Sequence, residues 1–118
     1  MPLFTEDAVW DGGDRFGVYE GSDAIHRFFA DVSSRITFAF HYMIAPVVEV
    51  ADDVESATAS WYLLEPATLD GQAAWLMGNY RDTYRREDGR WKFARVEIRF
   101  QTISPHDEGW ARRRFVGE

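Results

Sequence analysis

The sequence predicts an α+β fold in which a curved antiparallel sheet carries helical cover on one face. Three observations lead to this expectation: a short apolar segment ending at two glycines, one stretch with helical apolar spacing, and a run of long β-rich segments joined by turns. At 118 residues and 46% hydrophobic content, the chain is long enough to bury one core. We therefore expect a single domain over residues 1–104, followed by a polar tail over residues 105–118.

The first segments predict a small β-hairpin followed by a helix. Residues 8–11 form a short β-rich run, and we expect residues 16–20 to return beside it. A helix begins after Gly21, with Ser22 as the expected N-cap. Its apolar residues fall on one stripe: Ala24, Ile25, Phe28, Phe29 and Val32.

The middle of the chain predicts two long strands. Residues 37–50 are rich in β-branched and aromatic side chains, and Pro46 marks a bulge or an edge position because proline cannot donate to a ladder. After an Asp-Asp turn, residues 54–64 predict the next strand, which we expect to end before Glu65.

A long hairpin over residues 72–103, with Asp88-Gly89 at its tip, organises the sheet. Asp-Gly between two β-rich runs is a strong hairpin signal, because glycine accepts the positive φ of a primed turn. With these two residues as the turn, Tyr84 faces Phe93, and the alternation of side chains sets two faces. One face is mostly apolar, which is typical of a core or of one side of a ligand pocket. It carries Trp75, Met77, Asn79, Arg81 and Thr83 opposite Ala94, Val96, Ile98 and Phe100.

The bulk composition argues against several classes of function. A net charge of −7 argues against a nucleic-acid partner, and the absence of cysteine excludes a disulfide frame and a thiol nucleophile. The N-terminus lacks the features of a signal peptide and no stretch is apolar enough to cross a bilayer, so we expect a cytoplasmic protein without membrane contact. Three scattered histidines and the lack of a glycine-rich phosphate loop predict neither metal nor cofactor.

Four motifs along the chain form a recognisable set: Leu-Phe-Thr-Glu-Asp-Ala-Val-Trp at residues 3–10, the helix start at residues 21–25, Phe-His-Tyr-Met at residues 40–43, and the hairpin segments 78–82 and 88–93. In this order they resemble the opening segment, helix start, histidine-bearing strand and closing hairpin of the SnoaL-like branch of the nuclear transport factor 2-like (NTF2-like) superfamily, over essentially the whole chain. The resemblance implies a cone-shaped sheet wrapped by helices around a pocket, often in a homodimer. It does not name a reaction, because the fold is shared by many activities.

Two departures from the family pattern bear on function. Members usually begin with one or two helices that cap the cone, and this chain begins where those helices end. Dehydrochlorinase-like members also place an arginine five residues after the hairpin tryptophan, where this chain has Val96. Because a bare sheet would expose a large apolar patch, we expect either a second subunit over it or a true start upstream of Met1.

His41 is the candidate catalytic residue. A neutral imidazole in an apolar pocket can take a proton near pH 7, since its unperturbed pKa is about 6.5. The alternative is a strand histidine that only packs and forms hydrogen bonds. A general base usually has an orienting acid at its other ring nitrogen. Glu49 and Glu65 are the remaining candidates, and each is interpreted more simply as a solvated charge at a strand end.

Asn79 and Arg81 are candidate anchors for a carbonyl or an anionic group of a ligand. The alternative is that Arg81 extends to the rim while Asn79 bonds to a neighbour. By resemblance Trp10 also lines the cavity, which is compatible with a place in the core. The other expected pocket residues come from the apolar hairpin face: Trp75, Met77, Val96, Ile98 and Phe100.

Two functions are compatible with these residues. The first is a cofactor-independent lyase (dehydratase) or isomerase that acts on a small, largely apolar molecule, with His41 as base. The second is a non-catalytic ligand-binding or dimerisation module with the same fold.

Overall fold

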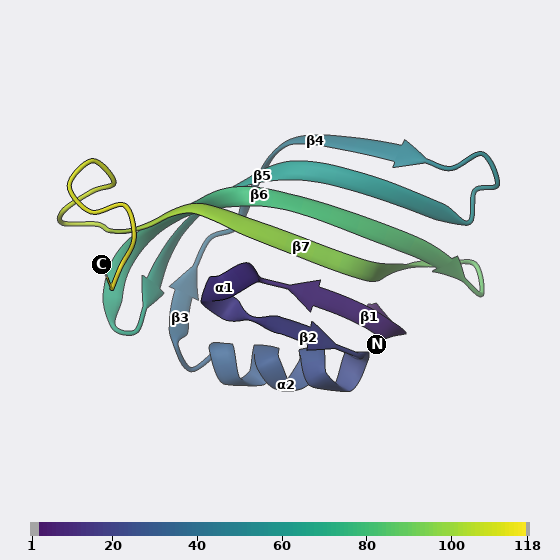
Figure 1. The fold of residues 1–118 in the computed structure, drawn as a ribbon, viewed down its shortest axis with the longest axis horizontal. Coiled ribbons are helices and arrows are strands. Elements are labelled where there is room, and N and C mark those ends of the chain that lie inside the picture. Colours follow the sequence, from purple (N-terminus) through teal and green to yellow (C-terminus); the bar gives the residue numbers. More distant parts are fainter. Residues whose placement is uncertain (1–2, 118) are drawn as a thin grey trace.

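A computed structural model describes residues 3–117 as one curled sheet with helical cover. Seven strands join in the order β2-β1-β7-β6-β5-β3, with β4 pairing β5. The strands and helices, in chain order, are β1 (Phe4–Asp11), α1 (Gly13–Phe16), β2 (Val18–Glu20), α2 (Ser22–Val32), β3 (Ile36–Ala39), β4 (Tyr42–Val50), β5 (Ser56–Leu69), β6 (Gln72–Glu87) and β7 (Arg90–Pro105). In Figure 1 the long strands β5, β6 and β7 curl together while α2 lies beneath β1 and β2. The predicted α+β class and curved, mainly antiparallel sheet are confirmed.

The first strand, β1, lies between β2 and the last strand, β7. β2 returns antiparallel beside β1, as expected, with Val9 opposite Glu20. On its other edge β1 pairs in parallel with β7, which places Trp10 opposite Val96. This parallel pairing was not among the sequence expectations.

Helix α2 supplies most of the cover over the inner face of the sheet. Its stripe packs inward, with Ile25 fully buried. Gly21 occupies the N-cap position at φ 89°, and no side chain among residues 3–117 caps the helix, so the expected Ser22 cap is wrong. A positive φ at this position favours glycine, which explains why the serine lies one residue inside the helix.

The expected strand over residues 37–50 is two strands. It breaks at Phe40 and His41, and both halves, β3 and β4, pair with β5. The break lies opposite Pro66, whose carbonyl accepts from the Phe40 N–H at 3.1 Å. Because proline has no N–H to return, the ladder cannot continue there. β5 itself runs through Pro66 to Leu69, so the expected end before Glu65 is wrong. Of the two alternatives for Pro46, a bulge or an edge position, the structure shows a bulge, between Ile44 and Val47.

The hairpin has the predicted tip but a different register beyond it. Asp88 and Gly89 both have positive φ, 52° and 76°, as a primed turn requires, and Tyr84 pairs with Phe93 as predicted. A bulge then shifts the pairs from Thr83 to Gly78 by one residue, so that Tyr80 lies opposite Ile98, and a second bulge beside Gly78 adds another residue to the shift. The predicted faces are therefore wrong for β6, whereas Val96, Ile98 and Phe100 of β7 lie on the inner face as predicted. The inner face carries the even-numbered residues of β6, and the outer face carries Trp75, Met77, Asn79 and Arg81.

Two apolar clusters form the core. The larger lies between α2 and the sheet and includes Trp10, Ile25, Val96 and Ile98. The second lies at the curled end, around Leu76 and Ile103, and the tail packs against it through Phe115. Phe115 thus anchors the tail, whereas Trp110 in the same tail is 55% exposed.

Candidate functional site

An apolar hollow of about 290 Å³ lies between α2 and the inner face of the curled sheet. It collects side chains from β1, β3, β5, β6 and β7, from both helices, and from the segment between β3 and β4. Its apolar lining includes Trp10, Phe16, Phe28, Leu76, Ile98 and Phe100. His41, Glu65, Tyr80 and Ser33 are the polar residues that line it. An apolar cavity with a few convergent polar groups is the usual form of a small-molecule site.

His41 and Glu65 form a hydrogen-bonded pair at the wall of this hollow. Nε2 of His41 lies 3.1 Å from Oε1 of Glu65, whose side chain is 4% exposed against 53% for the histidine. The pair forms because β5 continues through Pro66, so that period-2 alternation turns Glu65 inward opposite Leu76. The interpretation of Glu65 as a solvated strand-end charge is therefore wrong.

The carboxylate of Glu65 controls both the tautomer and the pKa of His41. Its hydrogen bond raises the pKa of the imidazole above the ordinary value, while burial acts in the opposite direction. Because Nε2 donates to Glu65, the neutral imidazole keeps the lone pair of Nδ1 free to accept a proton. The arrangement suits a general base that is held and oriented by a carboxylate.

Tyr80 is the second polar group with chemical potential in the hollow. Its ring stacks on Trp61 with centroids 3.9 Å apart and planes 5° apart. Within residues 3–117 its hydroxyl makes no hydrogen bond. Burial, and then the nearby charge of Glu65, raise the pKa of Tyr80. The hydroxyl is therefore protonated at neutral pH and is available as a donor to a bound molecule.

Asp82 supports Tyr80 from beneath the apolar lining. Its Oδ2 accepts hydrogen bonds from Nε1 of Trp61 and from the hydroxyl of Tyr84, both at 3.0 Å. The residue is 3% exposed, its Oδ1 has no partner within residues 3–117, and burial raises the pKa of its carboxyl group. Asp82 thus fixes the Trp61 ring against which Tyr80 stacks.

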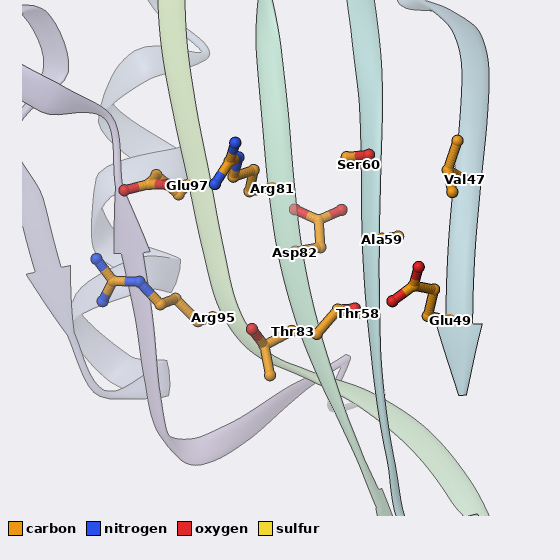
Figure 2. A pocket seen from close by; sticks show the side chains of 10 residues that line it. All are labelled: Val47, Glu49, Thr58, Ala59, Ser60, Arg81, Asp82, Thr83, Arg95 and Glu97. Atoms are coloured by element: carbon orange, nitrogen blue, oxygen red, sulfur yellow. The ribbon is translucent and has the colours of Figure 1, made fainter. Parts of the chain in front are cut away.

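The structure brings some of the sequence candidates to the hollow and moves others away. His41, Trp10, Ile98 and Phe100 line it, and Val96 is buried in the adjoining core cluster. The hairpin bulge places four candidates on the outer face instead: Trp75, Met77, Asn79 and Arg81. There, Asn79 accepts a hydrogen bond from Gln101 at 3.1 Å, and Arg81 lines an outer trough, shown in Figure 2.

Sequence reasoning named Glu65 as a candidate partner of His41 but preferred a solvated charge, and it missed Tyr80, although the place of Glu65 had a local signal. Every second residue of the stretch 61–69 is apolar except Glu65, and side chains two apart in a strand share a face. This alternation predicts one common face for Trp61, Leu63, Glu65, Ala67 and Leu69. Tyr80 gave no such signal, because its face depends on the bulge between Thr83 and Tyr84.

Other kinds of site find no support in the described part of the chain. Over residues 3–117, His, Asp and Glu side chains form no cluster of three that is arranged to hold a metal ion. Neither helix in that range has the length and apolar character needed to span a bilayer.

Comparisons with known proteins agree with this architecture. The family model for a SnoaL-like domain matches residues 2–97. The solved structure of LinA superposes with a TM-score of 0.78 at 21% identity, covering 87% of this chain and 71% of that one. A candidate aromatic ring hydroxylase from Novosphingobium aromaticivorans gives 0.77 at 28% identity, covering 87% and 73%. A candidate scytalone dehydratase from the same species gives 0.77 at 23% identity, covering 88% and 70%. Among curated protein sequences, none matches.

Proposed function

The chain belongs to the SnoaL-like domain family, and from this premise we propose that it is a cofactor-independent lyase or isomerase acting on a small, largely apolar molecule. The observation that carries the proposal is the pair of His41 and Glu65 at the wall of an apolar hollow. A base held by a carboxylate in such a site can remove a proton from carbon without any further group.

His41 is the proposed base. The C–H bond of the substrate breaks, its proton passes to Nδ1, and the buried carboxylate of Glu65 stabilises the imidazolium that forms. In an elimination the electron pair forms a new double bond as a leaving group departs from the neighbouring carbon. When that group is hydroxyl, the proton held by His41 is returned to it and water departs. In an isomerisation His41 returns the proton to another carbon.

Tyr80 is the proposed donor to an oxygen of the substrate. A carbonyl oxygen gains negative charge as the proton leaves carbon, and a fixed hydroxyl donor stabilises that charge. The raised pKa of Tyr80 keeps the proton on the phenol, so this residue donates a hydrogen bond rather than acting as a base. The aromatic lining of the hollow fits a ring or another compact apolar body beside these groups.

The names of two structural neighbours point in the same direction. One of the solved structures similar to this chain is a hexachlorocyclohexane dehydrochlorinase from Novosphingobium barchaimii, with 23% identity, and another is the candidate scytalone dehydratase. Both names denote eliminations. At these identities the neighbours share the fold, so the reaction proposed here rests on the pair in the hollow.

The test is turnover of a panel of small ring compounds that carry a carbonyl, hydroxyl or halide group. Incubation in D₂O, followed by NMR, detects both loss of the leaving group and exchange of hydrogen on carbon. We expect His41→Ala to lower the rate of any turnover by about 10²–10⁴-fold, the usual share of a general base. His26→Ala, which removes an exposed histidine of α2, is the matched control. Equal rates for His41→Ala and the unaltered protein would exclude His41 from the mechanism.

A second candidate function is ligand binding without chemistry. The exposure of His41, at 53% of its side chain, favours it, because an open site does not exclude water from the base. Binding of the same ring compounds, measured by quenching of tryptophan fluorescence, with no turnover of any compound in the panel would select this function over the first.

A further inference from the structure

Two phenylalanine rings separate the hollow from a second cavity of about 610 Å³, which we call the basin. The basin is lined by residues 12–16 and by Arg35, Leu69, Arg99, Phe100, Ile103 and Val116. Among residues 3–117, Phe16 and Phe100 alone line both cavities. Their rings are in contact, with centroids 5.2 Å apart and planes at 46°. The two rings therefore form a partition, and loss of either one would join the basin to the hollow.

The partition lies across the hollow from His41. The strand order β7-β6-β5-β3 puts β6 and β5 between Phe100 on β7 and the break between β3 and β4 that carries His41. Phe16 packs against Phe100 from α1, and its ring also meets the ring of Phe28 in α2 edge-on, at 6.4 Å between centroids. A molecule whose reactive carbon faces His41 therefore directs its opposite end toward the partition.

The turn around α1 holds Phe16 in this position. Asp11 accepts a hydrogen bond from the N–H of Gly13 at 2.9 Å and two from the guanidinium of Arg99 at 3.0 and 3.1 Å, which ties the start of α1 to β7. A Cβ on Gly12 would come 2.7 Å from the Cβ of Phe16, so the glycine lets the phenylalanine pack close to the end of β1. The ring of Phe16 thus acts as a wall of the hollow.

The basin is charged where the partition itself is aromatic. Its charged side chains are Asp14, Arg15, Arg35 and Arg99. A hydrocarbon arm would gain little in such a cavity, because it would take water from charged groups without forming hydrogen bonds to them. A hydroxyl group can donate and accept there. The space behind the partition therefore suits a polar extension of a molecule bound in the hollow.

We propose that Phe16 determines the length of the molecule that the hollow accepts. The hollow of about 290 Å³ ends at the partition, so it takes a compact ring, and an arm opposite the reactive carbon meets the ring of Phe16. Selectivity of this kind comes from exclusion of the longer compound rather than from a new attraction to the shorter one. The inference rests on the proposed function only in taking the hollow as the substrate site.

The experiment is a ligand-observed NMR titration of the full chain with three ketones, which measures binding without turnover. The ketones are cyclohexanone, 4-(3-hydroxypropyl)cyclohexanone and 4-butylcyclohexanone, whose arm has the same length but is apolar. We expect the unaltered protein to bind the hydroxypropyl compound at least about 10-fold more weakly than cyclohexanone. Phe16→Ala should abolish this difference, and the butyl compound should gain less than the hydroxypropyl compound.

Three further variants test the role of the partition. Phe16→Leu keeps a bulky side chain and should keep the length limit. Phe28→Ala is the matched control, because Phe28 lines the hollow but not the basin, so its loss enlarges the hollow without opening the partition. The hydroxypropyl compound should therefore remain the weaker ligand of this variant. Phe100→Ala removes the other half of the partition and should act as Phe16→Ala does. Far-ultraviolet circular dichroism confirms that each variant is folded.

Equal binding of cyclohexanone and the hydroxypropyl compound by the unaltered protein would overturn the proposal, as would folded Phe16→Ala and Phe100→Ala variants that still reject the arm. An equal gain for the butyl compound would contradict the placement of the arm in the basin. The proposed chemistry fails separately. A length limit without turnover of any compound would remove the chemistry and keep the role of Phe16, whereas His41-dependent turnover without a length limit would do the reverse.

Discussion

At the scale of single residues, the chemistry of the hollow depends on one buried carboxylate. The Glu65 side chain is 4% exposed and contacts Nε2 of His41 at 3.1 Å. A buried carboxylate is costly unless it is paired, and the hydrogen bond to Glu65 stabilises the charged form of the imidazole. The hydrogen bond therefore orients His41 although 53% of its side chain is exposed.

Replacing Glu65 by glutamine should lower the pKa of His41. The amide keeps the size of the side chain but removes the negative charge that raises the imidazole pKa. Histidine resonances followed by NMR as a function of pH measure the change, with His41→Ala to assign the signal. If turnover is found, its rise with pH should move to lower pH in the same variant. Glu55→Gln, at an exposed turn, is the control, and an unchanged His41 midpoint in Glu65→Gln would contradict the assignment.

Replacing Asp82 by asparagine should change how stability depends on pH. Burial raises the pKa of Asp82 in the folded state, so the folded protein holds this proton more tightly than the unfolded chain. The contribution of Asp82 to the free energy of unfolding therefore falls as pH rises from about 4, the unfolded value, through the folded pKa. Asparagine accepts the same bonds from Trp61 and Tyr84 without titrating. Urea unfolding between pH 4 and 7 should show a smaller decline for the variant, and parallel curves would contradict it.

The sequence could point to His41 and Trp10 because each lies in a motif of its family. It could not point to Tyr80, since the face of a strand residue depends on register, and register changed at a bulge that no glycine or proline marks. The same bulge carried Asn79 and Arg81 to the outer face. Glu65 was within reach of period-2 reasoning, but Pro66 beside it suggested a strand end.

At the scale of elements, two bulges shape the long hairpin. The first leaves Ala94 without a partner, between the pairs of Tyr84 with Phe93 and Thr83 with Arg95. The second lies beside Gly78, where an added Cβ would come 2.5 Å from the carbonyl oxygen of Arg99. Bulges bend a strand and increase its twist, so these two help to curl the sheet around the hollow. Only the second has a sequence signal, the glycine itself.

The turn between β4 and β5 stores strain that a substitution should release. Val54 adopts a left-handed conformation at φ 59°, which is unfavourable for a β-branched residue, and its side chain is exposed. Asparagine tolerates this region, so we expect Val54→Asn to raise the free energy of unfolding by about 1 kcal/mol. Val50→Asn, in the extended strand β4, should have the opposite sign because it removes a β-branched residue from a strand. Chemical denaturation measures both, and destabilisation by Val54→Asn would contradict the prediction.

At the scale of the whole molecule, the long antiparallel strands and the single long helix followed from local patterns. The parallel pairing of β1 with β7 did not, because it joins residues more than eighty positions apart, such as Trp10 and Val96, and leaves no local signal. This pairing places the first strand beside the last one. The two ends of the sequence therefore belong to one sheet, and the tail after β7 returns toward α1.

The tail after β7, residues 106–117, should contribute to the stability of the fold. Phe115 packs on the second core cluster and pairs with Ile103, and the guanidinium of Arg15 in α1 lies 3.8 Å from the centroid of its ring. Phe115 thus joins the curled end of β7 to the first helix. We expect Phe115→Ala to lower the free energy of unfolding by about 2 kcal/mol through lost packing and the lost cation–π contact.

Trp110 is the matched control in the same tail, because it is also aromatic but is 55% exposed. Trp110→Ala should change the free energy of unfolding by no more than about 0.5 kcal/mol, as for most exposed positions. Urea unfolding followed by circular dichroism compares the two variants without relying on tryptophan emission. If Phe115→Ala changed the free energy of unfolding as little as Trp110→Ala, the packing of Phe115 would not contribute to the stability of the fold. A fall in the free energy of unfolding for Phe115→Ala alone would mean that the contacts of this ring with the core and with α1 stabilise the whole fold.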